Sequence, residues 1–173
     1  MNDSIDRLQA ESDIRQLQAR YTDAVYRRDW QAVRACWADD GVWHAFGQRT
    51  AGREEIIGWL VSLTSMFPLI WQTAHGVILE IDGDEAVARL YIDEISCDLK
   101  DVRRFAMGLY HDRYRRTDGQ WIFAERHWDL LYLGPADLSA RLWDMPAFGP
   151  PPHSDMNRPN RPTLAAIQAE LGL

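Results

Sequence analysis

Apolar side chains recur at helical spacing at the start of the chain. After the acidic residues Glu11 and Asp13, the apolar positions are Ile14, Leu17, Tyr21, Ala24 and Val25. This repeat of three to four residues is the apolar stripe of one helix, and acidic residues suit its N-terminus. We therefore predict a first helix through this segment.

Two further helices are predicted before the pattern changes. One starts at Asp29, carries Trp30, Val33, Ala35, Cys36 and Trp37 on one stripe, and ends at Asp39-Asp40-Gly41. Residues 42–46 form a segment that is too short for a helix and rich in residues that favour strands, so we predict a short strand there. Residues 47–52 are predicted as a turn. The other helix is predicted over residues 53–66, before Pro68.

The following segments alternate with a period of two. The odd positions from Trp71 to Ile81 are mostly apolar and include His75, which predicts a strand with His75 on its apolar face. Three more strands are predicted over residues 86–97, 104–116 and 121–132. Turn sequences that contain a glycine, residues 82–84 and 117–119, separate two pairs of these strands.

Helices followed by an antiparallel meander predict an α+β fold in which helices cover one face of a bent sheet. Residues 1–133 would form this domain, which is long enough to bury a core with a cavity. Residues 134–173 are Pro-rich and would form a C-terminal arm ending in a short helix from Thr163 to Leu171.

The amino-acid composition disfavours several classes of partner and location for this protein. The net charge of −7 and the short, acid-interleaved basic runs argue against nucleic acid and anionic membranes as partners. No apolar stretch has the length of a membrane span or a signal peptide. Cys36 and Cys97 lie too far apart for a metal spacing or a disulfide framework, so we expect a cytoplasmic location.

Eight tryptophans indicate an aromatic pocket or interface. The sequence has no G-x-G-x-x-G motif and no P-loop, and we expect no nucleotide or other cofactor. His111 and Asp112, with His127 and Asp129 on the next predicted strand, lack the spacing of a metal site, so no metal is expected either.

Four separated segments resemble one family in order and spacing: IRQLQARYTDAVYRRDW, ADDGVWHAFG, TAHG and GLYHDRYRRTDGQWIFAERHW. Over residues 10–133 the chain resembles the SnoaL-like branch of the nuclear transport factor 2-like superfamily, nearest to scytalone dehydratase and hexachlorocyclohexane dehydrochlorinase. The resemblance implies a cone-shaped α+β barrel, in which N-terminal helices pack in a strongly curved, mostly antiparallel sheet that encloses a pocket. It also implies a cofactor-independent His–Asp dyad and a homo-oligomer, a trimer rather than a dimer.

The resemblance assigns catalytic positions. The family's histidine falls on His75 and an asparagine of the last strand on Asp129, but the position of the dyad aspartate is Tyr26. Asp23 or Asp129 would then replace that aspartate, or His75 would act as an acid or hydrogen-bond donor. From the residues alone, His75 could equally be a core histidine, and Tyr26 a pocket wall. The expected substrate-binding residues are Tyr21, Trp43, Trp71, Met107 and His127.

The sequence thus predicts a cofactor-independent lyase or isomerase that acts on a small hydrophobic, aromatic or polycyclic substrate. His75 would shuttle the proton in a dehydration or elimination, with retro-aldol loss of a small aldehyde as a variant. The alternative is a non-catalytic binding protein, or an assembly protein like the β subunit of a ring-hydroxylating dioxygenase.

Overall fold

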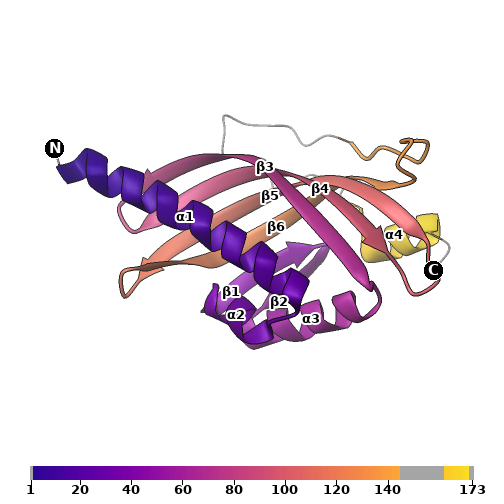
Figure 1. Cartoon of the computed structure of the whole chain (residues 1–173), viewed down its shortest axis with the longest axis horizontal. Coiled ribbons are helices and arrows are strands. Elements are labelled where there is room, and N and C mark those ends of the chain that lie inside the picture. The colour runs from indigo at the N-terminus through magenta and orange to yellow at the C-terminus, as the bar shows by residue number, and fades with distance from the viewer. Residues whose placement is uncertain (1, 145–161, 172–173) are drawn as a thin grey trace.

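The structure, a computed structural model, describes residues 2–144 and 162–171 (Figure 1). Its elements in chain order are α1 (Asn2–Arg27), α2 (Trp30–Ala35), β1 (Trp37–Ala45), β2 (Gln48–Ala51), α3 (Arg53–Ser65), β3 (Leu69–Asp82), β4 (Glu85–Cys97), β5 (Arg103–Thr117), β6 (Gln120–Gly134) and α4 (Leu164–Leu171).

The strands form one six-stranded sheet in the order β2-β1-β6-β5-β4-β3. β1 runs parallel to β6, and every other neighbouring pair in this order is antiparallel. The four long strands bend over α1, while α2 and α3 lie across the other end of the cone (Figure 1). The predicted α+β fold, with N-terminal helices packed against a strongly curved and mostly antiparallel sheet, is confirmed.

The predicted apolar stripe of α1 is the side that faces the sheet. Ile14, Leu17 and Ala24 are fully buried there, and each leucine or isoleucine buried in this way stabilises the fold by about 1.5–3 kcal/mol. Tyr21 completes the stripe and packs edge-on against Phe123 on β6, with the two ring centres 5.3 Å apart. The helix is held by its packing against the sheet rather than by helix propensity alone.

The second predicted helix is shorter in the structure than in the sequence pattern. Asp29 caps α2 by accepting a hydrogen bond from the Ala32 backbone N–H at 3.0 Å. The helix ends at Ala35, because the Cys36 carbonyl accepts from Phe123 N–H and Trp37 pairs with Phe123 across the sheet. Pairing with β6 therefore overrides the helical spacing of Trp37.

Residues 48–51, predicted as part of a turn, form the edge strand β2. Phe46 and Gly47, both at positive φ, make the two-residue turn that folds β2 back on β1. Tight hairpin turns need positive φ at both central positions, which glycine adopts easily and phenylalanine rarely does. Because phenylalanine is rare at such a position, the sequence did not predict this turn.

A β-bulge in β3 reverses the predicted orientation of His75. Ala74 pairs with Ile92 and Val77 pairs with Leu90, so β3 has one more residue than β4 between these pairs. A bulge of this kind shifts the alternation by one position. Gln72 faces inward before the bulge and Val77 after it, whereas His75 lies on the outer face with its side chain 52% exposed. The prediction that His75 lies on the concave face is wrong.

The predicted short C-terminal helix is present as α4. It is attached by the Leu164 N–H, which donates to the Phe46 carbonyl at 2.9 Å, and by the buried side chain of Ile167. The Pro-rich residues of the predicted arm at 145–161 lie outside the described residues. Within the described ranges, none of the helices has the length and apolar character needed to cross a membrane.

Candidate active site

A cavity of about 320 Å³ lies between the inner face of the sheet and helices α1, α3 and α4. Its walls are mainly aliphatic and aromatic, including Val25, Trp43, Trp59, Leu63, Ile70 and Leu130. This volume is at the small end of the range for small-molecule pockets, and an apolar wall with few polar groups is typical of them. The cavity therefore suits a compact, hydrophobic ligand.

Four polar side chains form a connected cluster in the cavity wall. The Tyr26 hydroxyl donates to the Gln72 backbone carbonyl at 2.6 Å. The Gln72 side-chain amide donates to the Glu94 carboxyl at 2.7 Å, and it lies 3.1 Å from the Tyr110 hydroxyl. Tyr26 comes from the last turn of α1, and the other three side chains come from β3, β4 and β5.

The sheet register brings this cluster together. Gln72 and Glu94 are direct cross-strand partners on β3 and β4, so their side chains meet on the same face of the sheet. Alternate residues of β4, namely Leu90, Ile92, Glu94 and Ser96, share that inner face, and Glu94 is the acid in this row. An apolar surface thus holds one carboxyl group in a fixed position.

Burial controls the ionisation of the cluster. Burial raises the pKa of Glu94, and the hydrogen bond from the Gln72 amide opposes this shift only in part. Burial also raises the pKa of Tyr26; its bond to the Gln72 carbonyl opposes that shift and the charge of Glu94 adds to it. A carboxyl group with a raised pKa keeps its proton to a higher pH than an ordinary glutamate, which favours a role as a general acid or base.

The second acid of the described cavity wall differs from Glu94. Asp98 accepts hydrogen bonds from Lys100 N–H and Val102 N–H and pairs with Arg104 at 2.7 Å. The Arg104 hydrogen bond, followed by the bond from Val102 N–H, lowers the pKa of Asp98. Asp98 therefore stays ionised and fixes the loop between β4 and β5, whereas Glu94 remains the acid available for proton transfer.

A buried ion pair supports the cluster from the far side of Tyr110. Arg126 on β6 makes two hydrogen bonds to Asp112 on β5, at 2.7 and 2.8 Å. The Arg126 guanidinium also lies 3.9 Å from the ring centre of Tyr110 and 4.7 Å from that of Tyr21. Burial raises the pKa of Tyr21 to about 12 despite the nearby Arg126, so the Tyr21 hydroxyl keeps its proton at neutral pH.

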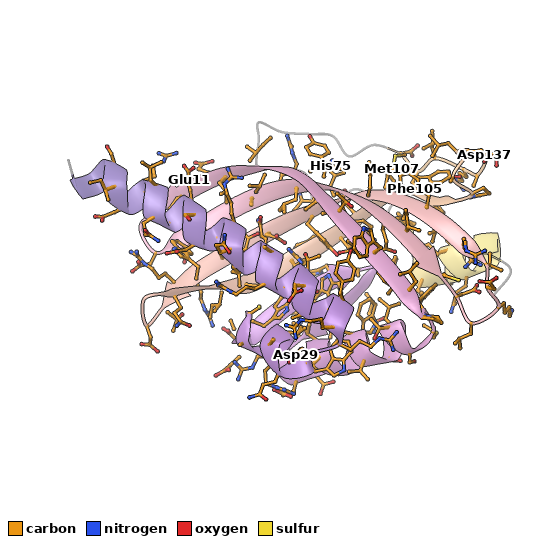
Figure 2. The ribbon with its side chains drawn as sticks, in the orientation of Figure 1. Glu11, Asp29, His75, Phe105, Met107 and Asp137 are labelled. Carbon is orange, nitrogen blue, oxygen red and sulfur yellow. The ribbon has the colours of Figure 1, made fainter. Side chains whose placement is uncertain are left out.

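The cavity contains three of the residues proposed from the sequence, Tyr21, Tyr26 and Trp43. His75 is outside it, 2.9 Å from Asp93 on the outer face (Figure 2). Asp23, one of the suggested replacements for the dyad aspartate, is exposed on α1 and paired with Arg27 at 2.9 Å. No histidine lines the cavity among the described residues.

The other proposed residues also lie outside the cavity. Trp71 is 55% exposed and stacks on Tyr26, with ring centres 4.9 Å apart. Met107 lies on the outer face of the sheet (Figure 2). His127 and Asp129 are also on that face, because Arg126 and Trp128 on the same strand face inward.

The sequence did not predict Gln72 and Glu94 as site residues, whereas Tyr110 was among the aromatic residues that could line a pocket. The bulge in β3 concealed the inward orientation of Gln72, because residues on either side of a bulge follow opposite parity. Glu94 had a readable signal, since it is an acid within the alternating apolar positions of β4. The tertiary pairing that brings Tyr26 to Gln72 rather than to His75 had no such signal in the sequence.

The helices and the curved sheet thus enclose a cavity with mainly apolar walls. The model of the SnoaL-like domain family matches residues 6–127. The chain belongs to this family. A search of curated proteins finds no match.

Solved structures show the same fold. The crystal structure of LinA has 23% identity and a TM-score of 0.74, covering 84% of this chain and 100% of LinA. A hexachlorocyclohexane dehydrochlorinase, LinA-type3 from Novosphingobium barchaimii, has 19% identity and a TM-score of 0.72, covering 83% and 99% of the two chains. A scytalone dehydratase-like protein from Novosphingobium aromaticivorans has 19% identity and a TM-score of 0.71, covering 82% and 95%. At these identities the likeness shows the fold alone.

Proposed function

We propose that the protein is a lyase or isomerase that uses Glu94 to transfer a proton on a small hydrophobic, preferably aromatic substrate. The observation that carries this proposal is the Glu94 carboxyl group in a cavity with mainly apolar walls, fixed by the Gln72 amide at 2.7 Å and with its pKa raised by burial. An isolated buried carboxyl costs stability, so its presence in a ligand-sized cavity favours a functional role.

The cluster suits an elimination. The Glu94 carboxylate takes a proton from a substrate carbon, and the C–H electrons form a double bond as the neighbouring C–O bond breaks. The protonated Glu94 then gives that proton to the departing hydroxyl, which leaves as water. In an isomerisation the same proton returns to a different carbon. Gln72 keeps the carboxyl in place, and the apolar walls exclude water from the reacting atoms.

Two similar structures support a reaction of this class by their names, which describe a dehydrochlorinase and a scytalone dehydratase-like protein. Both names denote the elimination of a small molecule. The polar residues proposed here, Tyr26, Gln72, Glu94 and Tyr110, contain no imidazole. The proton carrier in this chain is therefore proposed to be a carboxyl group rather than His75.

The test combines binding with turnover. Trp43, Trp59 and Trp128 line the cavity, so tryptophan fluorescence reports ligand entry. Aromatic and polycyclic alcohols are screened by fluorescence, and the ligands found are assayed for conversion. Glu94→Gln is expected to keep ligand affinity and to lose about 10²–10⁴-fold in turnover. Asp93→Asn is the matched control, because it changes the adjacent carboxyl on the outer face, and it should keep turnover.

Two outcomes would contradict the proposal. Wild-type turnover by Glu94→Gln would show that Glu94 does not carry the proton. Tight binding of the screened compounds without conversion of any would instead support the alternative, a non-catalytic binding protein.

The homo-oligomer expected from the resemblance, a trimer, stays a prediction. The outer surface of β3 and β4 exposes Leu69, Trp71 and Ile95, with Trp71 and Ile95 directly paired. An assembly would bury such an apolar patch. Light scattering that gives the monomer mass of 20.0 kDa at micromolar concentration would refute the predicted homo-oligomer.

A further inference from the structure

A second cluster of reactive side chains lies on the opposite face of the sheet from the cavity. Glu125 and His127 are two positions apart on β6, so their side chains project from the same face. His44 on β1 is the direct partner of His127 in the parallel pairing of the two strands. Two adjacent strands therefore present two imidazoles and a carboxylate side by side.

The ligand atoms of this cluster converge. The rings of His44 and His127 stack with centres 3.9 Å apart and planes within 5° of parallel. The Nε2 atom of His127 lies 2.8 Å from Glu125 Oε1, and that of His44 lies 3.1 Å from the same oxygen. One ligand atom from each residue falls within 4.8 Å of the others. For all three to contact one ion at about 2.0–2.2 Å, the two rings must tilt out of their parallel stack so that both Nε2 lone pairs point at the ion.

The surroundings suit a bound cation. The side chains of His44, Glu125 and His127 are 26%, 32% and 13% exposed, so an ion can enter while much of its water shell is replaced by protein. Arg113 Nε lies 3.8 Å from Glu125 Oε2, which leaves Oε1 to the imidazoles.

We propose that His44, Glu125 and His127 form a binding site for a divalent transition-metal ion of the Zn²⁺ class. Two nitrogen ligands and one oxygen ligand suit Zn²⁺, whereas Mg²⁺ and Ca²⁺ take oxygen ligands. The three side chains leave a further coordination position open to water. This proposal replaces the expectation of no metal, which considered His127 with residues of β5 but did not consider His44. It concerns the outer face and is independent of the proposed chemistry of Glu94.

The test measures metal binding directly. Calorimetric titration of the wild-type protein with ZnCl₂ at pH 7.5 should give one bound ion per chain, and MgCl₂ should not compete. His44→Ala and His127→Ala should each weaken binding by at least about 10–100-fold, the loss that follows even when an outer-shell partner is removed. His75→Ala is the matched control, since His75 also lies 2.9 Å from a carboxylate but belongs to no three-ligand group among the described residues. This variant should bind Zn²⁺ as the wild type does.

One measurement on the wild-type protein does not depend on the folding of a variant. Bound Co²⁺ should give the visible ligand-field absorption of a four- or five-coordinate ion, and ZnCl₂ should abolish it. Absence of this absorption, or Zn²⁺ affinity that is unchanged in His44→Ala and His127→Ala, would overturn the proposal. The three residues would then be a hydrogen-bonded cluster only.

Discussion

The ion pair behind the cavity gives a prediction whose magnitude follows from the structure. Asp112 and Arg126 are direct partners on β5 and β6, and their side chains are 0% and 2% exposed. Asp112→Asn keeps the size of the side chain and an acceptor for the Tyr114 hydroxyl. The substitution removes the negative charge and replaces one carboxylate oxygen with an NH2 donor, so one of the two hydrogen bonds from Arg126 is lost as well. The buried guanidinium is then left without a counter-charge.

Breaking a buried pair in this way costs about 3–5 kcal/mol. The rings of Tyr21, Tyr110 and Phe123 surround the guanidinium at 3.9–4.7 Å, but a ring face offers only a fraction of a full charge, about 0.5–2 kcal/mol each. For a chain of this length, 1 kcal/mol corresponds to about 2–4 °C in Tm. We therefore expect Asp112→Asn to lower Tm by about 6–20 °C.

The assay is urea denaturation, with the free energy of unfolding compared between variants at pH 7. Asp40→Asn is the control, because Asp40 pairs with Arg115 at an exposed site where such pairs contribute about 0–1 kcal/mol. The m-value should stay constant in both variants. If Asp112→Asn costs no more than Asp40→Asn, the reasoning about the buried charge is wrong.

Three further predictions concern the cluster and its surroundings. Because the folded-state pKa of Glu94 is raised, the wild type should lose stability relative to Glu94→Gln as pH rises from about 4.3 through the folded-state pKa. Urea denaturation at pH 4 and pH 8 measures the difference in unfolding free energy between the two proteins. The same difference at both pH values would refute this prediction. Tyr26→Phe removes the 2.6 Å bond to the Gln72 carbonyl and should cost about 0.5–1.5 kcal/mol by the same assay, whereas a stabilised variant would contradict that bond. His75→Ala should change the free energy of unfolding by no more than about 0.5 kcal/mol. It should also leave the affinity for aromatic ligands unchanged in a fluorescence titration. A ten-fold loss of affinity would show that His75 takes part in ligand binding.

The order of helices and strands could be predicted because each element carries a strong periodic pattern. The stripe of Ile14, Leu17 and Ala24 is buried as its spacing predicts. The errors arose where tertiary pairing decided the outcome. Trp37 fits a helix stripe, yet it pairs with Phe123, and β2 forms because a tight turn at Phe46 and Gly47 returns it to β1.

The site was harder to predict than the fold because one inserted residue changes which side chains reach the cavity. The bulge between Ala74 and Val77 brings Gln72 inward and turns His75 outward. A register argument that runs through the whole strand cannot detect this shift. The metal site proposed at His44, Glu125 and His127 had a similar obstacle, since β1 pairs with β6, the last of the described strands along the chain and far from β1 in the sequence.

The central claim is that Glu94 carries a proton inside an apolar, ligand-binding cavity. The most direct measurement is the pH titration of the Glu94 carboxyl carbon by ¹³C NMR, with its signal assigned by loss in Glu94→Gln. We predict a pKa above the ordinary glutamate value of about 4.3, rising further when an aromatic ligand displaces water from the cavity. A pKa at or below the ordinary value, or one that does not respond to the ligand, would contradict the account.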